Sequence, residues 1–180
     1  RDIYFQQSIS ATFQQEYSLE DLDLIRRDND LALTIIESIR HGQEKKGTLL
    51  DVGCGEGFFL SSARARGFRV YGLDYSSYGI ERYNPWMLDC FRQGDIFRSL
   101  ADLSREGERF SVVNLSGILE HVIDPRALLD GLKGVLEENG TIRVLVPNDD
   151  SKIQYLAERL GKAGKFWVCP PQHLNYFNTV

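Results

Sequence analysis

The sequence has few of the features that mark several large protein classes. Its 180 residues include three cysteines, at positions 54, 90 and 169, and no C-x-x-C pair, so we predict neither a disulfide framework nor a cysteine zinc site. No apolar stretch approaches the roughly 18 residues of a membrane span. The first residues also lack the basic, apolar and small-residue order of a signal peptide. We therefore expect a cytoplasmic protein with no membrane partner.

An excess of basic charge is also missing. The chain carries 21 Lys and Arg residues against 26 Asp and Glu residues, a formal net charge of −5, whereas binding to nucleic acid needs clustered positive charge. We therefore expect no nucleic-acid partner. The 42% hydrophobic and 11% aromatic residues suffice for a packed core, and the length suits one compact domain.

The first 42 residues are expected to form a helical segment in front of a main domain at 43–180. Ser18, followed by two acidic residues, is typical of a helix start, and apolar residues recur at helical spacing over 19–41. The preceding stretch from Tyr4 to Tyr17 is rich in Gln and aromatic residues. We interpret it as a lid over a ligand site or, as an alternative, as a cover for the flank of the helix.

Short apolar runs alternate with helical patterns in the main domain. We predict strands over 48–52, 69–73, 90–93, 110–115 and 141–146, and helices over 58–66, from Ser77 to Pro85, over 97–103 and from Asp124 to Gly140. This alternation predicts a doubly wound α/β fold, in which helices cover both faces of a mostly parallel sheet. Folds of this kind bind their ligands at the carboxyl edge of the sheet.

A glycine-rich turn follows the first predicted strand and indicates the type of ligand. Gly53, Gly55 and Gly57 have the spacing G-x-G-x-G, whereas a dinucleotide fingerprint would read G-x-G-x-x-G. Asp51 and Glu56 would repel a pyrophosphate but attract a ligand that carries an ammonium and a sulfonium. The turn therefore favours S-adenosylmethionine over NAD.

Acidic residues also follow the next two predicted strands. Asp74 ends the second strand, where a carboxylate can accept hydrogen bonds from both hydroxyls of a ribose. Asp95 follows the third strand and can accept from an adenine amino group. Together with the glycine turn, these residues predict a nucleoside site at one edge of the sheet.

With these residues, the chain resembles the class I S-adenosylmethionine-dependent methyltransferases, which have a Rossmann-like fold. The segments that carry the resemblance are Leu49–Gly57, Tyr71–Tyr75, Gln93–Ile96, Phe110–Pro125 and Thr141–Asn148. The resemblance implies that the cofactor is bound by Asp51, Gly53, Gly55, Gly57, Asp74, Tyr75, Asp95, Ile96, and the carbonyl of Asn114 or Leu115. Of these, Tyr75 would pack on the adenine and Asp51 would lie near the amino-acid end.

The resemblance also implies where the methyl acceptor binds. Glu120 and His121 follow the fourth strand and are candidates for a general base or for orienting the substrate. As an alternative, Glu120 only braces the loop. His173 is the second candidate base, or else a cap for its own loop. We predict no metal, because Gly117 stands where some quinone-pathway relatives have an acidic residue.

The nearest resemblance is to the quinone-biosynthesis O-methyltransferases and the nucleotide-sugar C-methyltransferases, which both modify small molecules. We therefore expect methyl transfer to oxygen or carbon of a small-molecule substrate. A non-catalytic module that binds S-adenosylmethionine as a sensor or partner protein is the main alternative. The resemblance implies further C-terminal strands, so we expect the domain at 43–180 to be incomplete. The acceptor and the oligomeric state are left open.

Overall fold

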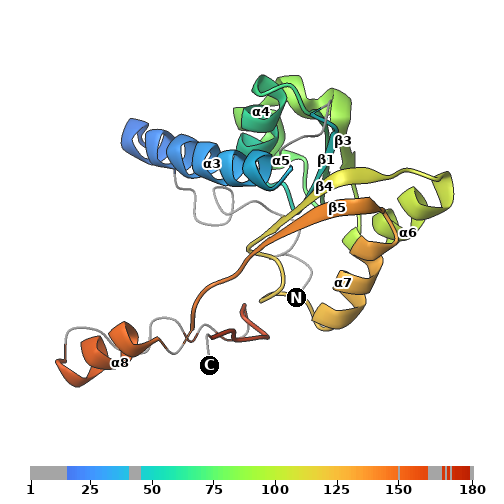
Figure 1. The fold of residues 1–180 in the computed structure, drawn as a ribbon. Helices are drawn as coiled ribbons and strands as arrows, with labels where there is room; N and C mark the ends of the chain where they lie inside the picture. The colour runs from blue at the N-terminus through green and yellow to red at the C-terminus, as the bar shows by residue number, and fades with distance from the viewer. Residues whose placement is uncertain are drawn as a thin grey trace.

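A five-stranded parallel sheet forms the centre of the molecule (Figure 1). The computed structural model describes residues 16–40, 46–149, 151–161, 168, 170 and 172–178. The strands are β1 (Thr48–Val52), β2 (Arg69–Asp74), β3 (Phe91–Gln93), β4 (Phe110–Ser116) and β5 (Leu136–Leu145), in the order β3-β2-β1-β4-β5. All neighbouring strands pair in parallel. The predicted doubly wound α/β fold is therefore confirmed.

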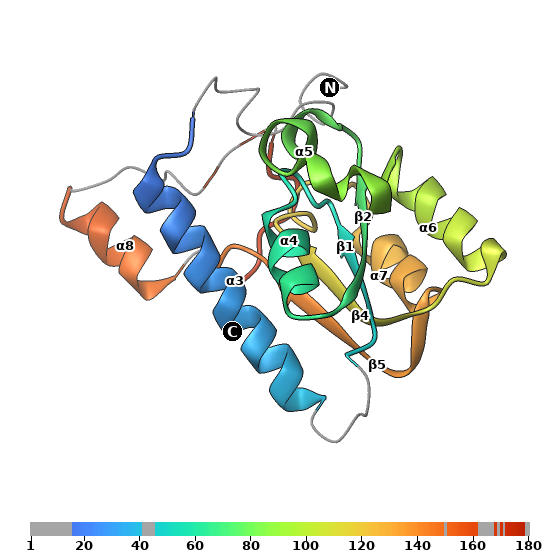
Figure 2. The same cartoon turned by 90° about the horizontal axis from the view of Figure 1, so that it is seen from above.

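Helices cover both faces of this sheet (Figure 2). They are α3 (Leu19–Ile39), α4 (Phe58–Ala65), α5 (Tyr78–Tyr83), the 3₁₀ turn η1 (Pro85–Cys90), α6 (Ile96–Glu106) and α7 (Pro125–Lys133). Helix α8 (Lys152–Arg159) follows β5, lies away from the sheet (Figure 1) and buries none of its residues. The apolar residues of α3 and α4 form one core cluster, and those of α6 and α7 form another. Among the described residues, no helix is both long enough and apolar enough to cross a membrane.

Strand β1 supplies both cores because neighbouring side chains of a strand point to opposite faces. Leu49 packs in the cluster under α3 and α4, and Leu50 packs in the cluster under α6 and α7. Both side chains are fully buried. A strand buried on both faces reads as a nearly continuous apolar run, and Asp51 is the one acidic residue within Thr48–Val52.

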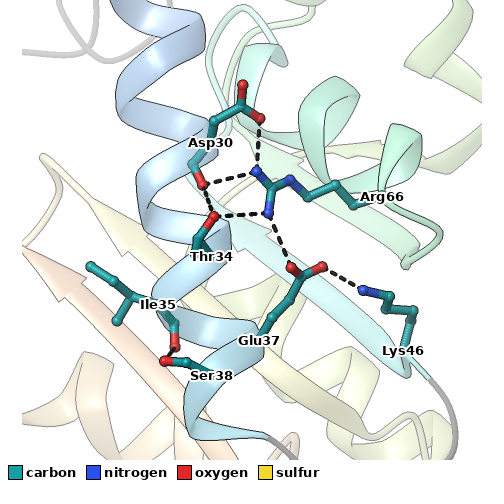
Figure 3. Close-up of polar contacts among 7 residues, drawn as sticks. All are labelled: Asp30, Thr34, Ile35, Glu37, Ser38, Lys46 and Arg66. Atoms are coloured by element: carbon teal, nitrogen blue, oxygen red, sulfur yellow. Dashed lines mark hydrogen bonds and ion pairs between the residues drawn. The ribbon is translucent and has the colours of Figure 1, made fainter.

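Polar contacts fix α3 to the rest of the domain (Figure 3). The guanidinium of Arg66, just after α4, contacts Asp30 Oδ1 at 3.1 Å and Glu37 Oε2 at 3.0 Å, and it donates to the Thr34 hydroxyl. Lys46, just before β1, pairs with the other oxygen of Glu37 at 2.6 Å. These contacts join α3 to the start of the sheet.

Several element boundaries differ from the prediction, most of all those of α7 and β5. The helix that was predicted to run from Asp124 to Gly140 ends at Lys133, and Leu136 already pairs with Phe110 in the sheet. The helical spacing was misleading because Val135 and Leu136 continue the apolar pattern while they pack from the turn and from β5. The first helix ends at Ile39 rather than at position 41, which lies outside the described residues.

Candidate functional site

The glycine turn after β1 has a backbone that glycine adopts most easily. Gly53, Gly55 and Gly57 all have positive φ, at 75°, 51° and 75°. A Cβ on Gly53 would lie 2.1 Å from Cδ1 of Ile118, whereas a Cβ on Gly55 would meet no atom of the described residues within 4 Å. The turn therefore packs closely against Ile118 at Gly53, whereas it is open at Gly55, where a ligand has room to approach.

Asp74, at the end of β2, is bound to this turn. Its Oδ2 accepts a hydrogen bond of 2.9 Å from the backbone N–H of Gly55, and its Oδ1 accepts one of 3.0 Å from Ser76. Burial raises the pKa of Asp74, while these backbone donors oppose the rise. Each carboxylate oxygen has a second lone pair, so Asp74 can still accept from two ribose hydroxyls. This arrangement fits the predicted nucleoside contact.

Behind the turn, three polar side chains lie in register across β1, β4 and β5. Asn114 donates from Nδ2 to Asp51 Oδ1 at 2.6 Å, and Arg143 donates from Nη1 to Asn114 Oδ1 at 2.6 Å. Burial raises the pKa of Asp51 to about 7, and the charge of Asp74 adds to this, whereas Asn114 and Arg143 lower it. A cation near Asp51 would favour its charged form.

Arg143 was missed in the sequence prediction. The available signal was a single charged residue inside an otherwise apolar run at Thr141–Val146. Its guanidinium lies 5.5 Å from the centre of the Phe59 ring, and burial lowers its pKa. A half-buried arginine of this kind needs an anionic or acceptor partner, and Asn114 and Asp51 supply it.

The predicted adenine-side residues meet at the end of β3. The Tyr75 hydroxyl donates a hydrogen bond to Asp95 Oδ2, and Asp95 Oδ1 caps α6 by accepting from the backbone N–H of Arg98 at 2.8 Å. Burial, followed by the Asp95 hydrogen bond, raises the pKa of Tyr75 to about 12. Ile96 is buried beside them. Asp95 therefore already holds Tyr75 in place, and its predicted adenine contact stays a prediction.

Leu115 places the end of β4 next to the glycine turn. It pairs with Val52, the residue before Gly53, and its side chain is fully buried. Its carbonyl, like that of Asn114, thus belongs to the same edge of the sheet as the turn. The predicted contact of either carbonyl with an ammonium group stays a prediction.

Tyr17, just before α3, packs against the first residue of α4 and the last residue of α5. The Tyr17 ring lies 5.4 Å from the Phe58 ring and 5.2 Å from the Tyr83 ring, between ring centres. Burial, followed by the charge and hydrogen bond of Glu56, raises the pKa of Tyr17. The end of the predicted lid thus contacts a residue of the glycine turn. The earlier part, from Tyr4 to Phe13, lies outside the described residues.

The predicted acceptor-side residues come together from two distant segments. Glu120 and His121 follow β4, and His173 comes from the C-terminal segment; one potential ligand atom from each lies within 4.8 Å of the other two. The imidazole centres of His121 and His173 are 5.0 Å apart. Glu120 is only 3% exposed, and its Oε2 has no hydrogen-bond partner among the residues that the structure describes. We call this group the Glu120–His121–His173 cluster.

Asn175 joins the two segments and was not singled out from the sequence. Its Nδ2 donates to the carbonyl oxygens of Leu119 at 3.0 Å and Val122 at 2.7 Å. The backbone N–H groups of Leu174 and Asn175 both donate to the carbonyl of Glu120. The only signal in the sequence was an asparagine two residues after His173, which is not specific. These bonds fix the cluster's geometry.

Comparison with known families gives one match over most of the chain. The family described as "Methyltransferase domain" matches residues 24–179. The ubiquinone biosynthesis O-methyltransferase of Nitrosomonas europaea is 31% identical over 135 residues, which are 74% of this chain and 57% of the relative. That of Pasteurella multocida is 31% identical over 133 residues, which are 68% of this chain and 54% of the relative. The chain thus spans little more than half of each relative.

Solved structures have the same fold at lower sequence identity. A SAM-dependent methyltransferase from Archaeoglobus fulgidus superposes with a TM-score of 0.63 at 19% identity, covering 94% of this chain and 66% of its own. Magnesium protoporphyrin IX methyltransferase from Synechocystis, solved with bound SAH, gives a TM-score of 0.59 at 15% identity, covering 91% of this chain and 73% of its own. These likenesses show the fold.

Proposed function

This chain belongs to the methyltransferase domain family, and from that premise we propose that it transfers a methyl group from S-adenosylmethionine to oxygen or carbon of a small molecule. Membership confirms the resemblance that the motifs indicated. The activity itself is a proposal, because the chain spans 57% of its Nitrosomonas europaea relative.

The observation that carries the proposal is the hydrogen bond between the glycine turn and Asp74. Because Gly55 N–H reaches Asp74 Oδ2 at 2.9 Å, the open turn and the carboxylate line one cradle at the carboxyl ends of β1 and β2. An open backbone beside a half-buried carboxylate suits a ribose whose linker carries no negative charge. A pyrophosphate would face the repulsion of Asp74 and Glu56.

The residues around this cradle suit the remaining parts of S-adenosylmethionine. Gly53, Gly55 and Gly57 would border the cofactor, and Asp74 would accept from its ribose. The base would lie against the side chains of Tyr75, Asp95 and Ile96, and Asp51 and the carbonyl of Asn114 or Leu115 would hold the ammonium end. When bound, the cofactor supplies an electrophilic methyl group on a sulfonium.

The Glu120–His121–His173 cluster would serve the acceptor. Ile118 lies against Gly53 and is two residues before Glu120, so the acceptor loop adjoins the glycine turn. His121 or His173 would take a proton from the acceptor, and Glu120 would orient the substrate or the imidazoles. Nδ1 of His121 lies 2.8 Å from the carbonyl oxygen of Gln172. This contact fixes the ring in one orientation.

The proposal also covers the location of the protein and its partners. We place the protein in the cytoplasm, with a small molecule as its substrate and neither nucleic acid nor a membrane as a partner. The net charge of −5 supports the absence of a nucleic-acid partner.

Calorimetry and a transfer assay test the proposal together. We expect the chain to bind S-adenosylhomocysteine, to give no heat with NAD, and to transfer labelled methyl from S-adenosylmethionine to at least one acceptor in a panel of hydroxylated aromatics and nucleotide sugars. Binding of NAD without a response to S-adenosylhomocysteine would instead indicate an oxidoreductase. Binding of S-adenosylhomocysteine with no transfer to any acceptor would favour a sensor or partner module.

A further inference from the structure

We propose that Asp149 is a further residue of the acceptor site, where one of its carboxylate oxygens receives a hydrogen bond from the methyl acceptor. The site would then select acceptors that carry an ammonium or hydroxyl group besides the methylated atom, and would exclude those that carry a carboxylate or phosphate there. This inference rests on the methyl transfer proposed above and narrows its substrate class. Asp149 follows β5 and was not singled out from the sequence.

Asp149 comes from the same edge of the sheet as Glu120. Leu145, the last residue of β5, pairs with Ser116, the last residue of β4, and its carbonyl accepts a hydrogen bond of 3.0 Å from the N–H of Gly117. Asp149 follows four residues after Leu145, and Glu120 follows three residues after Gly117. Both carboxylates therefore belong to loops that leave neighbouring parallel strands at their carboxyl ends, where α/β folds bind ligands.

The segment that carries His173 connects these two loops. The N–H of Leu174 donates to the carbonyl oxygen of Glu120 at 2.7 Å. Three residues further on, the N–H of Phe177 donates to Asp149 Oδ2 at 3.1 Å, and the Phe177 carbonyl oxygen accepts from the N–H of Asp149 at 2.6 Å. Glu120, His173 and Asp149 therefore lie around one short stretch of chain.

Buried polar atoms without a hydrogen bond gather around this stretch. Among the residues that the structure describes, they are Oδ1 of Asp149, Oε2 of Glu120 and Nδ1 of His173, and the only other such side-chain atom is the hydroxyl oxygen of Tyr83. Asp149 as a whole is only 1% exposed. Buried polar atoms almost always have a partner. Three exceptions around one segment therefore indicate a place where a ligand supplies the partners.

The chemistry of Asp149 determines which ligand group fits. An ionised carboxylate only accepts hydrogen bonds, so the partner of Oδ1 has to be a donor. A buried carboxylate without a partner is costly, and an ammonium or hydroxyl donor removes that cost. A carboxylate or phosphate at the same place would meet a like charge away from water, which is strongly unfavourable. The site therefore favours an acceptor that is neutral or positively charged at this end.

The two oxygens of Asp149 allow recognition to be separated from a purely structural role. Oδ2 holds the C-terminal segment through the N–H of Phe177, whereas Oδ1 is the recognising atom. Asp149→Asn keeps an amide oxygen for the Phe177 N–H and replaces the other oxygen with a donor. Because a buried charge without a partner destabilises the ligand-free protein, we expect the melting temperature of Asp149→Asn to equal or exceed that of the wild type.

Four phenols with different side-chain ends test the recognition. Tyramine ends in an ammonium, tyrosol in a hydroxyl, 4-ethylphenol in a methyl group and 4-hydroxyphenylacetate in a carboxylate. Calorimetry measures their binding to the protein with and without S-adenosylhomocysteine. We expect tyramine or tyrosol to bind at least about tenfold more tightly than 4-ethylphenol, and 4-hydroxyphenylacetate to bind most weakly. The tighter of the first two shows which donor the site prefers.

Asp149→Asn should reduce the preference for tyramine over 4-hydroxyphenylacetate by at least about tenfold. Its affinity for S-adenosylhomocysteine should stay within about twofold of wild type, because no proposed cofactor contact involves Asp149. Glu137→Gln is the matched control. It removes an exposed carboxylate near the amino end of β5 and should keep the wild-type preference.

Three results would overturn the proposal. The first is a wild type that shows no preference among the four phenols, including one that binds none of them at millimolar concentration. The second is an unchanged preference in Asp149→Asn. The third is a lower melting temperature of Asp149→Asn, which would leave the carboxylate a structural role only. Because S-adenosylhomocysteine is titrated separately and no methyl transfer is measured, a failure of the proposed function would be seen independently of these results.

Discussion

The glycine turn and the Glu120–His121–His173 cluster are held in place by different kinds of contact. The turn is fixed within a short stretch of chain, by positive φ angles at its glycines and by hydrogen bonds to the neighbouring strand β2. The cluster depends on hydrogen bonds between residues more than 50 positions apart, through Asn175. A local change should therefore damage the turn, whereas the cluster should be sensitive to its long-range clamp.

Ile118 connects the two regions. Its side chain fills the space against Gly53, and it stands two residues before Glu120. A change at this contact is therefore expected to reach both regions, and changes elsewhere are expected to reach only one.

The largest effect is expected for Gly53→Ala. Its φ of 75° disfavours any side chain, and the new Cβ would lie 2.1 Å from Ile118 Cδ1. We expect the free energy of unfolding to fall by about 2–4 kcal/mol, from backbone strain together with overpacking. Urea unfolding measures this. The double variant with Ile118→Ala should recover the overpacking part; if it recovers nothing, the contact with Ile118 is not the cause.

Gly55→Ala is the matched control for that change. The φ of Gly55, 51°, also disfavours a side chain, but no atom in the described part of the chain lies within 4 Å of the new Cβ. We expect a loss of about 1–2 kcal/mol in the free energy of unfolding. Because the Cβ would project into the proposed cofactor space, we expect a larger relative loss in S-adenosylhomocysteine affinity than in stability.

A smaller effect is expected for Asp74→Ala, and only on the turn. We expect affinity for S-adenosylhomocysteine to weaken by about 1–3 kcal/mol, because the ribose and the Gly55 N–H both lose a charged acceptor. Calorimetry measures the affinity. Asp89→Ala, which removes an exposed carboxylate paired with Arg64, should bind normally. An affinity equal to wild type in Asp74→Ala would contradict the ribose assignment.

Asn175→Ala should affect the cluster and leave the glycine turn intact, which is the reverse of the effect expected for Asp74→Ala. It removes both side-chain hydrogen bonds to the loop of the cluster, at a cost of about 1–2 kcal/mol in stability. We expect the rate of methyl transfer to fall while the affinity for S-adenosylhomocysteine stays within about twofold of wild type. The separate measurement of rate and affinity checks this. A matching loss of affinity would show that the two regions are coupled more widely than through Ile118.

The smallest effect is expected for the pH dependence of S-adenosylhomocysteine affinity and for its shift in Arg143→Met. Because the pKa of Asp51 is about 7, its charge forms as the pH rises, and affinity for the ammonium of S-adenosylhomocysteine should rise up to pH 7 and then level off. Arg143→Met removes a nearby positive charge that lowers this pKa, so the midpoint should move to higher pH by less than about one unit. Asp51→Asn should abolish the dependence. Calorimetry between pH 5 and 8.5 on the wild type and both variants measures this.

The same carboxyl affects stability with a definite sign. The pKa of Asp51 in the folded state lies above its ordinary value of 3.8, so the folded state binds more protons than the unfolded state at intermediate pH. The stability that this proton provides is complete below about pH 4 and is lost as the pH rises through 7. In Asp51→Asn this part of the slope should be absent from urea unfolding curves.

Most elements could be predicted because their signals are local. Strand β1 lies at Thr48–Val52 as expected, since an apolar run that short and bounded by glycine is typical of a buried strand. The error at Gly140 has the opposite cause. Leu128 and Leu132 pack from α7, while Leu136 packs from β5 against the same core. Periodicity alone therefore did not mark the end of the helix.

The sequence by itself determined the glycine turn, Asp74 and the order of strands and helices, because glycine spacing and strand-end carboxylates depend on residues close together in the chain. Only the tertiary structure placed Arg143 behind Asp51 and His173 beside His121. Those contacts depend on strand register and on where a distant segment packs, and hydrogen bonds such as those of Asn175 leave no distinctive pattern in the sequence.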